Sequence, residues 1–224
     1  MFYQVYFPCH LEAEELIVVH EVNSMLRKLA GILVFFLLIT TSVSVSIGCV
    51  GRVLYVGALP SPSDRLMSEM LVMLINERTG TNVQIRFFDD RDQLYSAMKL
   101  TDEAERVDII VEDTSQAMSL LKRQRLTDAN QEYLMAKELY DKELDIIWLN
   151  PFGFKKNLTI AEPTVSAPLL RRDVLTNFPL LPRILNKLAG TIDDETFNDL
   201  EARVSAGDKP KNVAKDFLRT KKLI

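Results

Sequence analysis

The amino-acid sequence predicts an α/β fold in three layers, αβα, with helices on both faces of a mostly parallel sheet and a helical C-terminal segment. Three observations support this fold class. Short β-rich runs alternate with helical periodicity from residue 52 onward, the pattern becomes wholly helical after Phe178, and no long linker or repeat divides the 224 residues. We therefore expect one compact domain.

The alternation starts with a β-rich run at 52–57 and helical apolar spacing at 64–78. The later runs follow the same scheme. We expect further strands at 82–88, 107–111 and 144–149, and further helices at 90–100, 114–122 and 130–140. Successive βα units predict parallel strands joined by right-handed crossovers. A last strand is expected at 164–171, and Pro168 within it indicates a sheet edge, because proline cannot donate to a central ladder.

Three helices are expected in the C-terminal segment, at 181–188, 193–204 and 210–218. Thr191 or Asp193 can cap the second of them. Asp208 can cap the third, whose Pro210 suits a first helical turn. Their apolar faces need a partner, since three short helices bury too little among themselves. We expect them to pack onto the sheet formed by residues 52–149.

The N-terminal part has the order of a signal peptide. Arg27 and Lys28 are followed by an apolar run and then by small and polar residues up to Gly48. We interpret residues 25–48 as this signal peptide. Residues 1–24 are acidic and lack Lys and Arg, so we interpret them as an over-extended gene start.

Cys49 directly follows Gly48, which resembles the bacterial lipoprotein box, where a small residue precedes the lipidated cysteine. Lipidation of Cys49 would hold the mature chain, residues 49–224, on a membrane, since more than one acyl chain gives lasting anchorage. Two alternatives stay open. Ordinary cleavage nearby would leave Cys49 as a free thiol, and an uncleaved leader would serve as a membrane anchor. We expect the domain to be extracytoplasmic, in the periplasm or on the cell surface, and membrane-anchored.

The chain downstream of Cys49 contains neither histidine nor cysteine. This absence excludes His general bases, Cys nucleophiles, disulfides and the usual zinc ligand sets. We therefore predict that the protein is not an enzyme and has no metal or cofactor, with chemistry by carboxylates alone as the alternative. Acidic clusters at 89–92 and 193–195 are interpreted as a turn and a helix start. The net charge of −4 disfavours nucleic acid, whose protein partners present a basic face.

Three blocks of residues resemble the substrate-binding proteins of glycine betaine, choline and carnitine ABC transporters. The first two are the strand at 53–57 with its loop and helix, and residues 93–98 together with 107–114. The third and most specific block comprises 167–175, 178–179, 185–190 and 213–218. The resemblance implies a type II periplasmic-binding-protein-like fold, in a family that grips a quaternary ammonium between two lobes, among aromatic rings.

Only one lobe of that fold fits this chain. In the family, the second lobe is inserted between a Trp-Leu-x-Pro segment and the C-terminal block. Here that segment is residues 148–151, and Pro168 follows after too few residues for even a small domain. We therefore expect the second lobe to be absent between about 152 and 167, and ligand binding to be weakened or lost.

The candidate ligand site lies where the loops at the carboxyl ends of the strands meet. Its predicted residues are Ser61, Glu112, Asp113, Thr114, Trp148 and Phe152. In this interpretation Glu112 and Asp113 face a cation, and Trp148 or Phe152 offers a ring. The alternative places Trp148 in the core, uses the acidic pair and Ser61 as helix caps, and lays Phe152 over the space of the lost lobe.

The sequence thus predicts an exported, lipid-anchored component of a glycine betaine or osmoprotectant ABC transport system. Its partners would be an ABC permease, a quaternary ammonium solute and the membrane. The alternative is an interaction or regulatory lipoprotein on the same fold, which binds a partner protein and no small solute.

Overall fold

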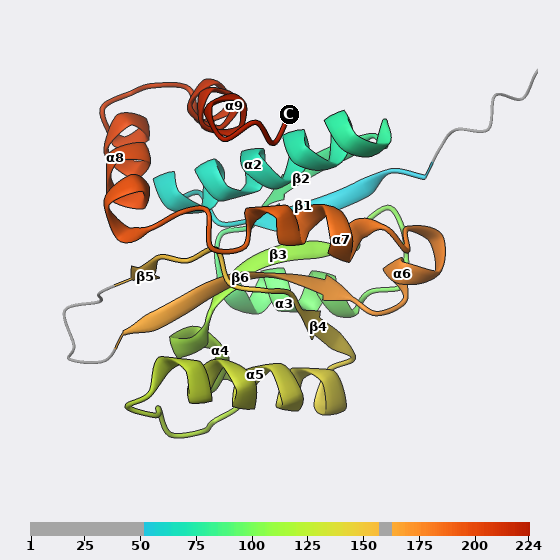
Figure 1. Ribbon diagram of the computed structural model, residues 1–224. Helices are drawn as coiled ribbons and strands as arrows, with labels where there is room; N and C mark the ends of the chain where they lie inside the picture. Colours follow the sequence, from blue (N-terminus) through green and yellow to red (C-terminus); the bar gives the residue numbers. More distant parts are fainter. Residues whose placement is uncertain (1–51, 157–162) are drawn as a thin grey trace, which may run out of the picture. The chain divides into compact units, whose positions relative to one another are not determined.

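The computed structural model describes residues 52–156 and 163–224, so the expected leader and Cys49 lie outside it. One sheet crosses the middle of the domain, with helices on both faces (Figure 1). Its strand order is β2-β1-β3-β6-β4, and a short β5 pairs with β6. The strands are β1 (Leu54–Ala58), β2 (Val83–Phe87), β3 (Ile109–Asp113), β4 (Ile146–Trp148), β5 (Lys155–Lys156) and β6 (Thr164–Arg171).

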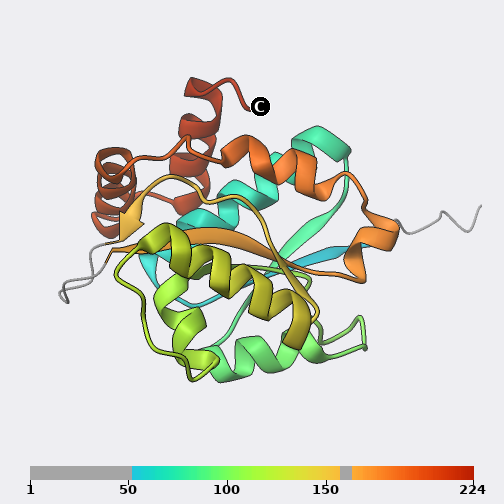
Figure 2. The same cartoon turned by 60° about the horizontal axis from the view of Figure 1, so that its bottom comes forward.

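The helices form the two outer layers. They are α2 (Pro62–Thr79), α3 (Arg91–Lys99), α4 (Thr114–Leu120), α5 (Ala129–Glu143), α6 (Val174–Asn177), α7 (Leu181–Leu185), the 3-10 turn η1 (Asn186–Leu188), α8 (Asp194–Ser205) and α9 (Pro210–Thr220). One face of the sheet is covered by α2 and the C-terminal helices, and the other by α3, α4 and α5 (Figures 1 and 2). The predicted αβα class is therefore confirmed. The short elements α6 and β5 were not predicted.

Side chains of the sheet alternate between two hydrophobic cores. Leu54, Val56 and Leu170 point to the core on the α2 face. Ile110 and Leu169 point to the core on the α5 face. β1 runs parallel to both β2 and β3, which confirms the parallel pairing predicted from the βα units. β6 runs antiparallel to β3 and β4.

The prediction that Pro168 marks a sheet edge is wrong, because β6 lies between β3 and β4. The nitrogen of Pro168 faces β4, since its carbonyl oxygen accepts a hydrogen bond from the Leu149 N–H at 2.9 Å. In a regular ladder the Leu149 carbonyl would accept a bond from residue 168, which proline cannot donate. The Tyr133 hydroxyl donates to that carbonyl instead, at 3.0 Å. A side chain thus replaces the missing backbone donor.

The C-terminal helices share one core with α2 and the sheet and do not form a separate bundle, as predicted. They reach the sheet through α2, against which α7, α8 and α9 all pack (Figure 1). Within the described ranges, no helix is long and apolar enough to cross a membrane.

Of the helix caps predicted in the C-terminal segment, the one by Asp193 is confirmed and the one by Asp208 is wrong. Asp193 accepts a hydrogen bond from the Thr196 N–H at 2.8 Å and caps α8, as predicted. The predicted cap by Asp208 is wrong, because α9 begins after Lys209 without a side-chain cap. Asp208 instead contacts the Arg203 guanidinium at 3.3 Å, and Pro210 has no N–H that needs a cap.

Candidate ligand site at the carboxyl edge of the sheet

Three helices begin at the carboxyl ends of β1, β2 and β3, and each start is fixed by a side-chain cap. The Ser61 hydroxyl accepts a hydrogen bond from the Asp64 N–H at 3.1 Å at the start of α2. Asp90 accepts from the Gln93 N–H at 2.8 Å at the start of α3, so the cluster at 89–92, which was interpreted as a turn, includes the start of a helix. Asp113 caps α4, which follows β3 directly. These caps bring the three helix starts to one edge of the sheet.

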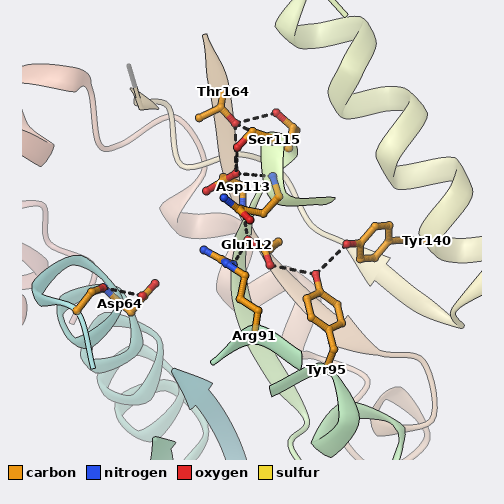
Figure 3. Close-up of polar contacts among 11 residues, drawn as sticks. Asp64, Arg91, Tyr95, Glu112, Asp113, Ser115, Tyr140 and Thr164 are labelled. Carbon is orange, nitrogen blue, oxygen red and sulfur yellow. Dashed lines mark hydrogen bonds and ion pairs between the residues drawn. The ribbon is translucent and has the colours of Figure 1, made fainter. Parts of the chain in front are cut away.

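Glu112 is the most enclosed charged group at this edge, with 2% of its surface exposed. The Arg91 guanidinium donates to one of its carboxylate oxygens, and the Asp113 N–H donates to the same oxygen at 2.9 Å (Figure 3). Burial raises the pKa of Glu112 to about 7, although the charge of Arg91 opposes this shift. The side chain of Arg91 is 31% exposed, so this ion pair has one partner in the interior and the other partly in contact with solvent.

Two tyrosines continue the network into the core on the α5 face. Tyr95 donates its hydroxyl hydrogen to the second oxygen of Glu112 at 3.1 Å. The hydroxyl oxygens of Tyr95 and Tyr140 lie 2.8 Å apart (Figure 3). Burial raises the pKa of both tyrosines, so they remain neutral. The buried carboxyl group of Glu112 is therefore fully hydrogen-bonded, as an enclosed charge requires.

Asp113 and Thr114 tie the start of α4 to the start of β6. One oxygen of Asp113 accepts from the Gln116 N–H at 2.9 Å and from the Ser115 hydroxyl at 2.6 Å. The hydroxyl of Thr114 lies 3.0 Å from that of Thr164 on β6. Thr114 is fully buried, so it joins elements and does not face solvent.

The two predicted aromatic residues lie on opposite faces of the sheet. Trp148 is 1% exposed and packs edge-on against Tyr133 and Tyr140 in the core on the α5 face. Phe152 is fully buried in the core on the α2 face, where it stacks on Phe154. The structure therefore does not bring the two rings together.

A hollow of about 30 Å³ opens at this edge between the starts of α2, α3 and α4. It is lined by Ser63, Asp64, Met67, Arg91, Val111, Glu112, Asp113, Phe154, Ser166 and Phe197. Of the predicted site residues, Glu112 and Asp113 line it, and Ser61 lies at its rim, where its hydroxyl donates to the Asp64 carboxylate at 2.6 Å. Thr114, Trp148 and Phe152 do not line it.

Sequence reasoning missed Arg91 and Phe197 at this hollow. Arg91 belongs to the acidic cluster interpreted as a turn, and none of the predicted site residues lies in the loop after the second strand. That loop position was the available signal, because carboxyl ends of parallel strands meet at one edge. Phe197 comes from α8, and its ring stacks on Phe154 with the centroids 3.9 Å apart. Nothing local in the sequence indicates that contact.

The path of the chain below these rings depends on Gly153. Its φ is +124°, and an added Cβ would lie 2.8 Å from the carbonyl oxygen of Ile192. Only glycine fits there without displacing the backbone. The close approach lets the Ile192 N–H donate to the Phe152 carbonyl at 3.2 Å, which brings the start of α8 against the segment that holds Phe154.

The arrangement can bind a small cation more readily than it can perform a reaction. Asp64 and Asp113 offer negative charge at the hollow, while Glu112 is neutralised by Arg91. The described residues contain no group of three or more His, Cys, Asp or Glu side chains placed to hold a metal ion.

Comparisons with known proteins show that part of this chain is similar to a transport family. Residues 162–220 match the family model described as the substrate binding domain of ABC-type glycine betaine transport system. No curated protein matches the chain by sequence. A crystal structure of a glycine betaine/carnitine/choline ABC transporter is similar, with a TM-score of 0.69 and 13% identity, over 77% of this chain and 99% of that chain.

Apo YehZ from Escherichia coli is also similar, with a TM-score of 0.60 and 14% identity, over 76% of this chain and 99% of that chain. At 13% and 14% identity, the two structures support the fold alone. The family model supports similarity in sequence over residues 162–220. The resemblance found in the sequence is confirmed: residues 162–220 match the substrate binding domain of ABC-type glycine betaine transport system, and the chain shares its fold with these two structures.

Proposed function

We propose that this chain is an exported substrate-binding-like component of a glycine betaine or osmoprotectant ABC transport system, with its binding of solute weakened or lost. A lipid on Cys49 would hold it at the outer side of the membrane, near an ABC permease. The site would be the hollow at the carboxyl edge, and the solute would be a quaternary ammonium compound. The chain would not be an enzyme.

The observation that supports this proposal best is the small size of the hollow. Its volume of about 30 Å³ is far below the ~300–1,000 Å³ of typical small-molecule sites. The rings of Phe154 and Phe197 stack on each other, so each covers a face that could otherwise contact an ammonium group. The site retains negative charge from Asp64 and Asp113 but offers little apolar surface to a ligand.

The length of the connection between β4 and β6 supports a single lobe. β4 ends at Trp148 and β6 begins at Thr164, and the residues between them are too few for a domain of about 50 residues. A solute at the carboxyl edge would therefore keep one side in water. There a cation–π contact contributes only ~0.5–1 kcal/mol per ring, against ~2 kcal/mol when the contact is desolvated.

Calorimetric titration of the chain with glycine betaine and with choline tests the proposed binding. We expect dissociation constants in the millimolar range or no binding, because a loss of roughly 2 kcal/mol over the two rings at the hollow, Phe154 and Phe197, lowers affinity about thirtyfold. Asp113→Asn should weaken any choline binding further, whereas Asp102→Asn, at an exposed position away from the hollow, should not. Micromolar binding by the monomer would contradict weakened binding.

Mass spectrometry of the native protein tests the proposed anchor. We expect the mature chain to begin at Cys49 and to carry acyl groups. An unmodified Cys49 would exclude lipidation, and a mature N-terminus upstream of Leu29 would also exclude cleavage of the leader.

The second candidate function is an interaction or regulatory lipoprotein that binds a protein and no small solute. It is favoured by a second, larger hollow of about 340 Å³ beside β4, which shares no lining residue with the first. Uptake of labelled glycine betaine by cells with and without the gene separates the two functions. Reduced uptake after deletion supports a part in transport, and unchanged uptake supports the second function.

A further inference from the structure

The last helix, α9, is strongly basic in a chain whose net charge is −4. From Lys209 to Lys222 the sequence has six Lys or Arg residues and one acidic residue, Asp216. Asp216 is already paired with Arg203 of α8, at 3.4 Å. Among the described residues, none of the six cations forms an ion pair. This segment is therefore a concentration of positive charge without close compensation.

The charges of α9 lie along one exposed side of the helix. Lys211, Lys215 and Arg219 follow one another at intervals of four residues, so they line up about 6 Å apart along the axis. All three are exposed, whereas the opposite side of the helix is buried through Val213, Ala214, Phe217 and Leu218. Like charges at this spacing repel each other, so a negatively charged partner would stabilise them.

The C-terminal end of α9 lies at the end of the domain where the chain enters. The Arg78 guanidinium, at the end of α2, donates to the Leu223 carbonyl at 2.8 Å. Asn82, four residues after Arg78, accepts from the Leu54 N–H at the start of β1, at 3.0 Å. Arg52 comes two residues before Leu54, and both Arg52 and Arg78 are exposed. The entry of the chain and the basic helix therefore belong to the same end of the molecule.

A lipid on Cys49, as proposed above, would hold this end close to a membrane. Cys49 precedes Arg52 by three residues, which span at most ~11 Å when fully extended. This reach is comparable to the distance of ~8 Å over which charges interact at physiological salt. The opposite edge of the sheet, at the start of α2 and of α4, carries Asp64 and Asp113, which a negative surface repels.

We infer that the exposed side of α9, together with Arg52 and Arg78, binds the headgroups of anionic phospholipids in the membrane that holds the lipid anchor. The inference rests on the proposed anchor, because the short tether brings these cations to the surface. A lipid anchor and a basic patch together give lasting attachment, and each Lys or Arg near an anionic surface raises affinity roughly fivefold. The hollow at the carboxyl edge then faces away from the bilayer.

The acidic turn at 102–105 determines which side of the domain rests on the membrane. It joins α3 to β3, so it lies at the same edge of the sheet as the start of β1. However, α3 covers the face of the sheet opposite to α2 and α9 (Figure 1). A negative surface repels this turn and attracts α9, so the domain should lie on its α2 and α9 side.

Reconstitution of the native full chain into lipid vesicles tests the contact. One set contains phosphatidylcholine alone, and in the other about a third of the lipid is phosphatidylglycerol. A water-soluble acetylating reagent, followed by mass spectrometry, reports the accessibility of each lysine. We expect Lys215 and Lys222 to react at least about fivefold more slowly on the anionic vesicles, and this difference to disappear at about 0.5 M salt. Lys137 on α5 is the internal control and should react equally on both.

Two matched double variants locate the contact on α9. Lys215→Glu with Arg219→Glu should abolish the protection of Lys222. Lys122→Glu with Lys137→Glu changes the net charge by the same amount on the other side of the sheet and should preserve that protection. Circular dichroism checks that both variants keep the fold.

Flotation of the vesicles at high salt separates the inference from the anchor on which it rests. A chain that floats with neutral vesicles, but whose Lys222 reacts equally on both compositions, overturns the inference and leaves the anchor intact. A chain that floats only with anionic vesicles, and only at low salt, supports the basic contact and excludes the anchor. A chain that floats with neither overturns both.

Discussion

The guanidinium of Arg91 contacts the carboxylate of Glu112 from the start of the neighbouring helix α3, and it connects a nearly inaccessible acid to solvent. One oxygen of Glu112 is held by this contact and by the Asp113 N–H, and the other by the Tyr95 hydroxyl. The charge state of Glu112 should therefore influence the stability of the whole edge.

We expect the domain to lose stability as the pH rises from 5 to 8. Burial raises the pKa of Glu112 to about 7, above its ordinary value of 4.5. A raised folded-state pKa gives a contribution that is complete below about pH 4.5 and is lost as the pH rises through about 7. The free energy of unfolding should fall by roughly 2–3 kcal/mol over this interval, as measured by urea denaturation.

Glu112→Gln serves as the control for this pH effect. It keeps the shape of the side chain and removes the titrating group, so most of the slope should disappear. Burial also raises the pKa of Asp108, so a smaller slope should remain. Equal slopes in the variant and the wild type would show that Glu112 does not govern the effect.

Arg91→Met should destabilise the domain at pH 8 and much less at pH 5. The methionine keeps an apolar stem but leaves the ionised Glu112 without its charged partner, which costs about 2–3 kcal/mol for a pair that is open on one side. At pH 5 the carboxyl is mostly protonated and needs no cation. Arg203→Met, which removes two ion pairs on the surface, should have little effect at either pH. Equal losses at both pH values would count against the pairing.

Tyr133 and Pro168 should be energetically coupled through the Leu149 carbonyl. Tyr133→Phe removes the only donor to that buried carbonyl in the described structure and should cost about 1–2 kcal/mol. In a Pro168→Ala background the restored N–H can donate to Leu149, so the same change should cost less. A double-mutant cycle by urea denaturation measures this difference. Additive effects would show that the hydroxyl does not substitute for the missing backbone donor.

Removal of the chain after Asn177 should leave a collapsed domain without cooperative unfolding. The truncation deletes α7, α8 and α9 and exposes the side of α2 that they cover. We expect binding of a hydrophobic dye and the loss of a sharp thermal transition. Removal of residues 221–224 alone should preserve the transition. A cooperative melt of the shorter chain would mean that the C-terminal helices are dispensable.

Much of the fold could be predicted because many of its helices and strands depend on residues that are close together in the sequence. Periodicity located the major strands and most helices, and a short polar side chain before a helix, such as Asp193, marked its start. The strand order could not be predicted this way. The prediction for Pro168 failed because its tolerance within a central strand depends on Tyr133, which is distant in the sequence and adjacent only in the fold.

The part of the candidate site that could be predicted consists of residues at the ends of strands. Glu112 and Asp113 follow a strand and do line the hollow, as their position indicated. The side on which a ring lies was not predictable, because Trp148 and Phe152 are close in sequence yet belong to different cores. The pairing of Arg91 with Glu112 spans two separate βα junctions, so no local pattern reveals it.

The central position of β6 has a consequence for the order in which the chain can fold. A nascent chain that has been made only as far as β4 has an empty slot between β3 and β4: β3 can already pair with β1, whereas β4 has no partner in the sheet until β6 is made. Closing such a long-range pairing is slow compared with forming a local βα unit. For the exported chain proposed above, this delay would leave the sheet incomplete on its β4 side, and the chain easier to pass through a translocation pore, until β6 has been made.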